Sequence, residues 1–247
     1  MSQFHDVCNE HYINLILTTE TQFPHQRDSV MHFFEQLRKK YPGLKNFYSR
    51  EQGDYVLEED KTGGKYRWVT LDPKRISSGY MMPESFDASC EQHLAILDAL
   101  PHQLSISPLD CETLNLTYGF DFAYAGNQHQ LIANALGIGP TFEKAREIPG
   151  AQLVSVDPTI QFALVPDCRI QCRLSFEPRT TAYHVKTNEY PEENLSVFFT
   201  LRKYGSIDPG ETFVSTFEDL MRRGQKLVDD YLMENVLVPL QTAILIE

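Results

Sequence analysis

The chain has 247 residues, of which 42% are hydrophobic and 23% charged, and its formal net charge at pH 7 is -12. These proportions are ordinary for a soluble globular protein of one large or two smaller domains. The negative charge opposes binding to nucleic acid and to anionic membrane surfaces. No apolar stretch approaches the roughly 20 residues that span a bilayer, and the N-terminus has neither the basic nor the apolar region of a secretory signal.

The cysteines predict a reduced, cytoplasmic protein. They are Cys8, Cys90, Cys111, Cys168 and Cys172. An odd number without paired spacing argues against disulfides. Cys168 and Cys172 would lie about 13 Å apart along a strand, which is too far for a disulfide bond. We therefore expect buried, free thiols.

The first part of the chain predicts the order strand, helix, four short strands, helix. A run rich in Ile and Leu predicts a strand over 11–19, and apolar residues at helical spacing predict a helix over 30–41. Ser85 is the expected N-cap of a second helix, which Pro101 should stop. The four short strands are expected over 44–48, 55–59, 65–71 and 75–82.

The clearest periodic signal is the stretch 111–122, CETLNLTYGFDF, near the middle of the chain. Apolar and polar residues alternate there, which is typical of a strand with one buried and one solvated face. We predict that this central strand is interior to a sheet, with Leu116, Tyr118 and Phe120 facing helices. It could pair with the opening strand of the chain.

A similar order of elements follows the central strand. A short helix over 128–136 is expected between its cap, Asn127, and Gly137, and a surface loop over 139–150 comes next. A stripe of apolar residues predicts a long final helix over 211–234. Strands are expected over 152–156, 159–165, 169–176 and 195–202, with 183–186 as one more candidate.

This order of elements predicts an α+β fold of two β-α-β(3–4)-α units, residues 1–105 and 106–247. Two such units usually place mainly antiparallel sheets side by side, with helices packed on one face. The repeat is one of element order, because the two halves share no recognisable sequence identity.

Several short patterns along the chain carry a resemblance. They are Tyr41-Pro42, Trp68-Val69-Thr70-Leu71, Gly79-Tyr80, the central strand LNLTYGFDF, and Phe217, Leu220 and Tyr231 of the last helix. In these features the chain resembles an uncharacterised, sporadically distributed bacterial family of about this length, built from two such units. The family's central strand often carries Arg-Tyr where this chain has Thr117-Tyr118. The resemblance implies the fold and brings no activity with it.

No catalytic or nucleotide-binding motif occurs: the sequence lacks a P-loop, G-x-G-x-x-G, G-x-S-x-G, H-E-x-x-H and a paired C-x-x-C. His5, Cys8 and His11 are three residues apart and would share one face of a helix, as zinc ligands can. The alternative, which we prefer, is a terminal segment without metal. We therefore expect no metal and no cofactor.

The polar face of the central strand is the candidate ligand site. Asn115, Thr117 and Asp121 project together there, and Asn127 and His129 follow at the start of the next helix. A carboxylate, an amide and an imidazole near a helix N-terminus suit a small polar ligand. The simpler interpretation is a solvated sheet face followed by a helix cap, and it is the one we favour.

Aromatic residues offer another possibility, since the chain has 12 Tyr and 15 Phe. An aromatic sheet face can bind single-stranded nucleic acid by stacking. Aromatic residues at strand spacing belong more often to the core, however, and the net charge opposes nucleic acid. We expect no nucleic-acid partner.

The segment after Asn235 is unusually apolar for a chain end. Pro239 should interrupt any continuous helix, so we expect the long helix to end near Asn235. The tail then packs on its own sheet or docks on a second copy, and we favour a homodimer. The residues expected at that contact are Val236, Leu237, Leu240 and Ile244.

Together these features predict a non-enzymatic, cytoplasmic interaction or scaffold protein that binds itself or another protein. The alternative is a small-ligand-binding protein or an enzyme that uses the polar sheet face near Asn115, Asp121 and His129. An enclosed pocket with a buried carboxylate would favour the alternative. A flat, solvated face would favour the interaction protein.

Overall fold

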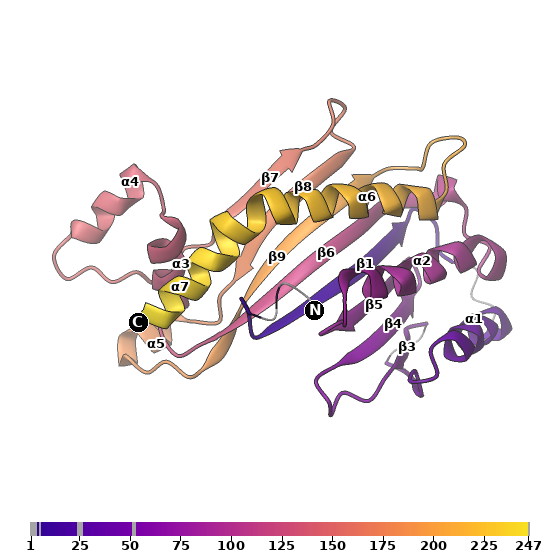
Figure 1. Cartoon of the computed structure of the whole chain (residues 1–247), viewed down its shortest axis with the longest axis horizontal. Coiled ribbons are helices and arrows are strands. Elements are labelled where there is room, and N and C mark those ends of the chain that lie inside the picture. Colours follow the sequence, from indigo (N-terminus) through magenta and orange to yellow (C-terminus); the bar gives the residue numbers. More distant parts are fainter. Residues whose placement is uncertain (1–3, 5, 24–26, 51–52, 247) are drawn as a thin grey trace.

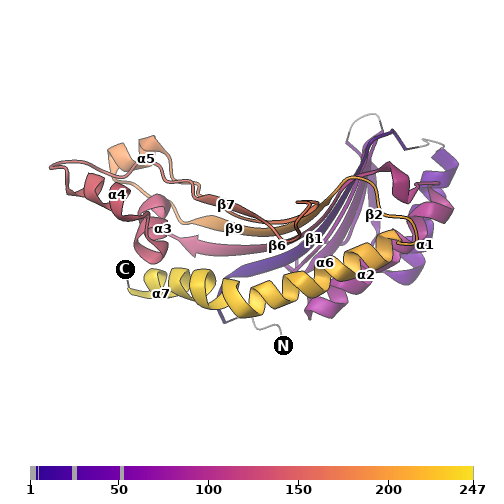
Figure 2. The same cartoon turned by 90° about the horizontal axis from the view of Figure 1, so that it is seen from above.

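The computed structural model describes residues 4, 6–23, 27–50 and 53–246. Within them the chain forms a nine-stranded sheet in the order β2-β3-β4-β5-β1-β6-β9-β8-β7, and every neighbouring pair is antiparallel. The sheet is long and twisted, and helices pack on one of its faces (Figures 1 and 2). The α+β class and the antiparallel sheet that the sequence predicts are confirmed.

The bounds of the strands are β1 (Glu10–Thr19), β2 (Asn46–Ser49), β3 (Tyr55–Glu58), β4 (Tyr66–Asp72), β5 (Arg75–Met81), β6 (Cys111–Tyr124), β7 (Thr159–Ala163), β8 (Ile170–Glu177) and β9 (Glu193–Tyr204). The α-helices are α1 (Arg27–Lys40), α2 (Phe86–Gln103), α3 (Gln128–Leu136), α4 (Pro140–Glu143), α5 (Ala182–Thr187), α6 (Phe213–Leu227) and α7 (Val238–Ile246). Two short 3₁₀ turns, η1 (Pro108–Asp110) and η2 (Lys144–Glu147), and a π-helical segment, η3 (Val228–Leu237), complete the chain.

The predicted central strand is β6, and it lies at the middle of the sheet between β1 and β9. Its alternation places Leu116, Tyr118 and Phe120 on the helix-bearing face, where all three are buried. The prediction for this strand is therefore confirmed, as is its pairing with the opening strand β1, in which Leu15 lies opposite Leu116.

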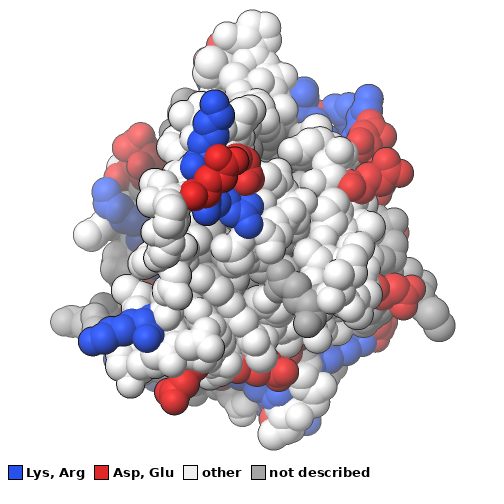
Figure 3. All heavy atoms as spheres, turned by 90° about the vertical axis from the view of Figure 1, so that its left-hand side faces the viewer, with Lys and Arg blue, Asp and Glu red and all other residues white. Residues whose placement is uncertain are grey.

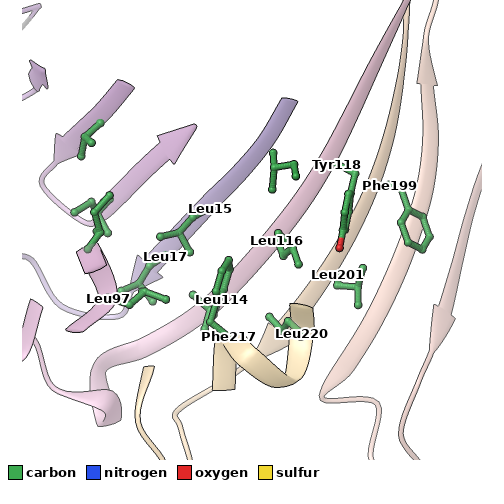
Figure 4. Close-up of a cluster of buried hydrophobic side chains, with 14 of the residues drawn as sticks. Leu15, Leu17, Leu97, Leu114, Leu116, Tyr118, Phe199, Leu201, Phe217 and Leu220 are labelled. Atoms are coloured by element: carbon green, nitrogen blue, oxygen red, sulfur yellow. The ribbon is translucent and has the colours of Figure 1, made fainter. Parts of the chain in front are cut away.

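The core lies between this part of the sheet and helices α2 and α6. Figure 4 shows side chains of β1, β6 and β9 meeting those of the two helices. Leu97 of α2 and Phe217 and Leu220 of α6 are fully buried there. Burial of such side chains is worth about 1.5–3 kcal/mol each, so this contact contributes strongly to the stability of the fold.

The final helix is longer than the sequence predicts. It continues from α6 through η3 into α7 and ends at Ile246, so the expected end near Asn235 is wrong. Pro239 lies in the first turn of α7, directly after the π-helical segment, where the N–H of Val238 bonds the carbonyl of Met233. This change of hydrogen-bond pattern accommodates a residue that has no N–H of its own.

The apolar tail packs within the chain. Val236, Leu237 and Leu240 are buried, and Ile244 is half-buried against the core. Helix α7 lies against α3. The intramolecular alternative therefore describes Val236, Leu237 and Leu240, and Ile244 is the one residue of the four that keeps partly exposed surface. The homodimer contact expected through these residues stays a prediction.

Three local predictions are also wrong. Residues 152–156 form no strand, because the carbonyl of Leu153 and the N–H of Val156 bond side chains of α3 rather than a neighbouring strand. Residues 183–186 lie in α5, whose first turn is closed when the N–H of Thr181 donates to His184 Nδ1. Pro101 does not stop α2, which runs to Gln103.

None of the helices formed by the described residues is both long enough and apolar enough to cross a lipid bilayer.

Candidate functional site: the uncovered sheet face

Helices α1, α2, α6 and α7 lie on one side of the sheet, and the opposite face, which we call the open face, is uncovered and concave (Figure 2). Successive strand residues point to opposite faces, so the register identifies its members. They include Glu10 and Tyr12 of β1, Trp68 of β4, Gly79 of β5, Asn115, Thr117, Gly119 and Asp121 of β6, Arg173, Ser175 and Glu177 of β8, and Ser196, Phe198, Thr200, Arg202 and Tyr204 of β9.

Two glycines allow aromatic rings to lie along the open face. A Cβ atom on Gly119 would stand 2.1 Å from Tyr12 Cε2, so the ring of Tyr12 occupies the space above this glycine. Tyr12 reaches Phe198 on β9 in an edge contact with ring centroids 6.3 Å apart. On β5, a Cβ on Gly79 would stand 2.5 Å from Trp68 Nε1. The face thus carries half-buried rings that a partner can touch.

A shallow groove of about 240 Å³ crosses the open face over β6, β9, β8 and β7. Pockets for small molecules usually enclose roughly 300–1,000 Å³ and bury most of the ligand. This groove is smaller and open, so it suits a chain lying across the sheet better than an enclosed molecule. Its lining includes Thr117, Phe198 and Tyr204, with Arg173 and Arg202 towards one end and Glu177 towards the other.

Arg202 is held in place within the groove. Its Nε donates to Asn115 Oδ1 (2.7 Å), and one Nη donates to the hydroxyl of Tyr204 (3.3 Å). Arg173 lies on the neighbouring strand, opposite Thr200. No carboxylate among the described residues forms an ion pair with either guanidinium group. Two positive charges are therefore available in a protein whose net charge is -12.

Carboxylates gather at the other end of the open face. The register places Glu10, Asp121, Ser196 and Glu177 side by side on β1, β6, β9 and β8. Burial raises the pKa of Asp121, and the hydroxyl of Ser196 opposes that rise by bonding the carboxylate. Glu177 is paired with Arg179, whose Nη lies 3.1 Å from its Oε2. The open face therefore has an acidic end.

The cationic and acidic ends are well separated. Arg173 and Glu177 are four residues apart on β8, which corresponds to about 13 Å along the strand. The rings of Tyr12 and Phe198 and the small Ser175 occupy the one row of the open face between them. The open face thus presents guanidinium groups, aromatic rings and carboxylates in sequence.

The residues predicted to bind a ligand do not form one site. Asn115 and Asp121 both lie on the open face, but they are six residues apart, about 20 Å along β6. Asn115 reaches the groove, where it positions Arg202. Asp121, only 8% exposed, belongs to the acidic end.

Asn127 and His129 hold the start of α3. Asn127 Oδ1 accepts from the N–H groups of His129 and Gln130, and its Nδ2 donates to Leu153 O (2.8 Å). His129 Nδ1 accepts from the N–H of Val156 (3.1 Å), and Nε2 donates to the carbonyl of Thr180 (3.2 Å). The side chains of Asn127 and His129 are therefore hydrogen-bonded to backbone groups, as the helix-cap interpretation expects.

The residues that the sequence reasoning missed are Arg173 and Arg202, together with the rings of Tyr12 and Phe198. A signal was available, because glycines inside strands often mark a close approach of a neighbouring group. Gly79 and Gly119 both have this role.

The zinc ligands considered at the N-terminus cannot be assessed together, because His5 lies outside the described residues. Cys8 is buried, its Sγ is 3.5 Å from the carbonyl of Phe4, and burial raises the pKa of its thiol to about 12. In the part of the chain that the structure describes, no three His, Cys, Asp or Glu side chains are placed to hold a metal ion.

One end of the molecule, formed by α3, α4, α5 and α7, carries few charges. Figure 3 shows this end as a largely uncharged surface with charged side chains in small groups. Phe142 of α4 and Leu245 and Ile246 of α7 are exposed, Leu245 by 78%. Exposed apolar side chains of this kind are typical of surfaces that contact other proteins.

Comparison of the chain with protein-family models, with curated proteins and with solved structures found no match.

Proposed function

We propose that the protein is a non-enzymatic, cytoplasmic interaction protein that binds a segment of another polypeptide across its open face. The observation that supports this most directly is the concave, uncovered sheet, on which half-buried rings lie beside two guanidinium groups that form no ion pair with a described residue. A sheet face left without helices presents a large surface to a partner. The free thiols of all five cysteines agree with a reducing compartment.

Binding is a better account of this face than catalysis. The groove is shallow and open, whereas an acid or base needs to be held in geometry beside an enclosed substrate. Asp121 is a carboxylate with a raised pKa, but it lies at the acidic end, away from Arg202. The small-ligand alternative would use Asn115 together with Arg202 in the groove.

The proposal is tested by affinity purification of the tagged chain from its source cells with quantitative mass spectrometry. Phe198→Asp places a charge among the rings of the open face, and we expect it to abolish retention of the partner. Tyr231→Asp is the matched control, because Tyr231 is an exposed ring on the helix-bearing side. Equal retention by the wild type and both variants would contradict the proposal.

The two-unit layout is also part of this proposal. Its support is the position of β1 and β6, which lie side by side at the middle of the sheet, with β2–β5 beyond β1 and β7–β9 beyond β6. On this reading residues 1–105 and 106–247 each supply one half of the open face. A partner segment would then span both halves.

Self-association is a second candidate, and the edge strand β7 favours it. All five residues of β7 are exposed, and it pairs only with β8 among the described strands. Its sequence, Thr-Ile-Gln-Phe-Ala, contains neither a charge nor a proline. Edge strands usually carry such residues to prevent pairing with another chain.

A further inference from the structure

The groove on the open face has the chemistry of a carboxylate-binding site. Arg202 is oriented by Asn115 and Tyr204, which bond Nε and one Nη, and its remaining donors form no bond to any other residue that the structure describes. Arg173 is exposed on the adjacent strand. Planar guanidinium groups recognise carboxylates through paired, charge-assisted hydrogen bonds.

Hydroxyl groups lie between the two arginines and the middle of the sheet. Thr117 Oγ1 and Thr200 Oγ1 are 3.0 Å apart and share one hydrogen bond. Only one of the two hydroxyl protons is used in that bond, so the other is free to donate. The groove therefore offers neutral donors beside its two positive charges.

The acidic end of the open face restricts where a negative group can lie. Asp121, Glu10 and Glu177 outnumber the one guanidinium group beside them, Arg179, which is paired with Glu177, so this end repels a carboxylate while Arg173 and Arg202 attract it. A negatively charged partner residue is therefore directed to one end of the groove. This sets the direction in which a partner segment lies on the sheet.

Building on the proposed function, we propose that the partner segment is acidic and presents a Glu or Asp side chain to Arg173 and Arg202. Phe198 lines the groove and its ring touches that of Tyr12, which suits an extended chain with an apolar residue next to the acidic one. A free anion would use the arginines without needing the rings.

The experiment measures fluorescence anisotropy of two labelled hexapeptides with the full chain. One peptide alternates glutamate with phenylalanine, and the other alternates lysine with phenylalanine. We expect the glutamate peptide to bind at least about tenfold more tightly, and Arg173→Gln and Arg202→Gln each to weaken it by about tenfold, as expected for loss of a charge-assisted hydrogen bond.

Arg222→Gln is the matched control, because Arg222 is exposed on α6 and paired with Asp219. It should leave binding of the glutamate peptide unchanged. Arg173 is exposed, so its replacement keeps the variant folded even if Arg202→Gln disturbs the strand. Equal binding of the two peptides, or binding unaffected by both Arg→Gln changes, would overturn the inference.

Inorganic phosphate is added as a competitor to separate a free-anion site from a peptide site. Displacement of the peptide by phosphate at equal concentration would show that a free anion suffices and would overturn the inference. In affinity purification, a partner lost with Phe198→Asp but retained with both Arg→Gln variants would overturn this inference alone. A partner retained with all three would overturn the proposed function.

Discussion

Gly224 lies where α6 crosses the central strand, and its missing side chain sets how closely the helix approaches the sheet. A Cβ atom here would stand 2.7 Å from the hydroxyl of Tyr118 and 3.0 Å from Cε2 of its ring. That ring cannot move aside freely, because it is stacked on Phe86 with centroids 5.6 Å apart. The glycine therefore makes room for a ring of the sheet.

We predict that Gly224→Ala destabilises the protein by about 1–3 kcal/mol, the usual cost of overpacking a core. The sign of the change in stability is informative, because Gly→Ala inside a helix otherwise stabilises a protein by about 1 kcal/mol. Urea unfolding measures the change.

A second substitution provides the control. The hydroxyl of Tyr118 is buried without a partner among the described residues, so Tyr118→Phe alone should cost little. Combined with Gly224→Ala, Tyr118→Phe should restore part of the lost unfolding free energy. A Gly224→Ala variant as stable as the wild type would show that α6 does not sit this close to the sheet.

His93 predicts a loss of stability in mild acid. It is buried on α2, with Nδ1 2.7 Å from the hydroxyl of Ser78 and Nε2 3.1 Å from the carbonyl of Ile13. Burial lowers the pKa of His93 from 6.5 to about 4. Between these two values the unfolded chain binds a proton that the folded chain does not, so stability falls as the pH falls from about 6.5 towards 4.

The expected loss from this one group is about 2 kcal/mol between pH 7 and pH 5. Urea unfolding of the wild type and of His93→Gln at both values of pH measures it. The change in unfolding free energy between the two values of pH is compared between the wild type and the variant, because carboxylates titrate in both proteins. An identical pH dependence in the variant would show that folding leaves the pKa of His93 at its ordinary value.

At the scale of elements, the sequence predicts correctly those features that depend on interactions between residues close together in the chain. The alternation in β6 and the cap Asn127 with Gly137 around α3 depend on neighbours in the chain, and the structure has both where the sequence places them. The strand expected over 152–156 fails for the opposite reason. Its backbone groups bond Asn127 and His129, about 25 residues earlier in the chain, and no periodic pattern records that contact.

The π-helical segment could not be predicted from the sequence either. Pro239 indicates a break in an α-helix, and the break is present as a change of hydrogen-bond pattern rather than as an end. Burial of the tail against α3 favours continuation of the helix, because stopping it would leave Leu237 and Leu240 in water. A long-range contact therefore overrides a local signal.

Helix α7 should behave as part of the core. We predict that Leu240→Ala costs about 2–5 kcal/mol, as expected for truncation of a fully buried side chain. Leu245→Ala, at the exposed end of the same helix, should change stability by less than about 0.5 kcal/mol. Unfolding by urea compares the two. Leu240→Ala as harmless as Leu245→Ala would mean that the tail does not pack on the chain.

At the scale of the whole molecule, half of the candidate site could be predicted. The polar face of β6 was recognised, and Asn115 does belong to the groove. Its cationic partners could not be identified from the sequence. Arg202 and Arg173 lie near β6 only because β9 pairs with β6 and β8 pairs with β9 in the sheet. Pairing between strands that are far apart in sequence is decided by the fold of the whole chain, so a strand's own pattern cannot reveal its neighbours.

The free edge of β7 can pair with itself around a two-fold axis. An antiparallel pairing centred on Gln161 places Ile160 opposite Phe162 of a second copy, and Phe162 opposite its Ile160. The two side chains are 47% and 46% exposed and would cover each other, and aromatic residues opposite β-branched residues stabilise such pairs. The edge strand at the other end of the sheet differs, because β2 is flanked by Lys45 and Arg50.

We therefore predict that the protein forms a dimer through β7, in which the two sheets become continuous and the two open faces lie side by side. Light scattering should give twice the mass of one chain. Gln161→Lys and Gln161→Glu each place like charges directly opposite at the centre of the pairing, which is destabilising, so each variant alone should be monomeric. Mixing the two variants places opposite charges there and should restore the dimer as a heterodimer. A wild-type chain that stays monomeric as its concentration rises, or a Gln161→Lys variant that remains dimeric, would rule out this edge as the contact.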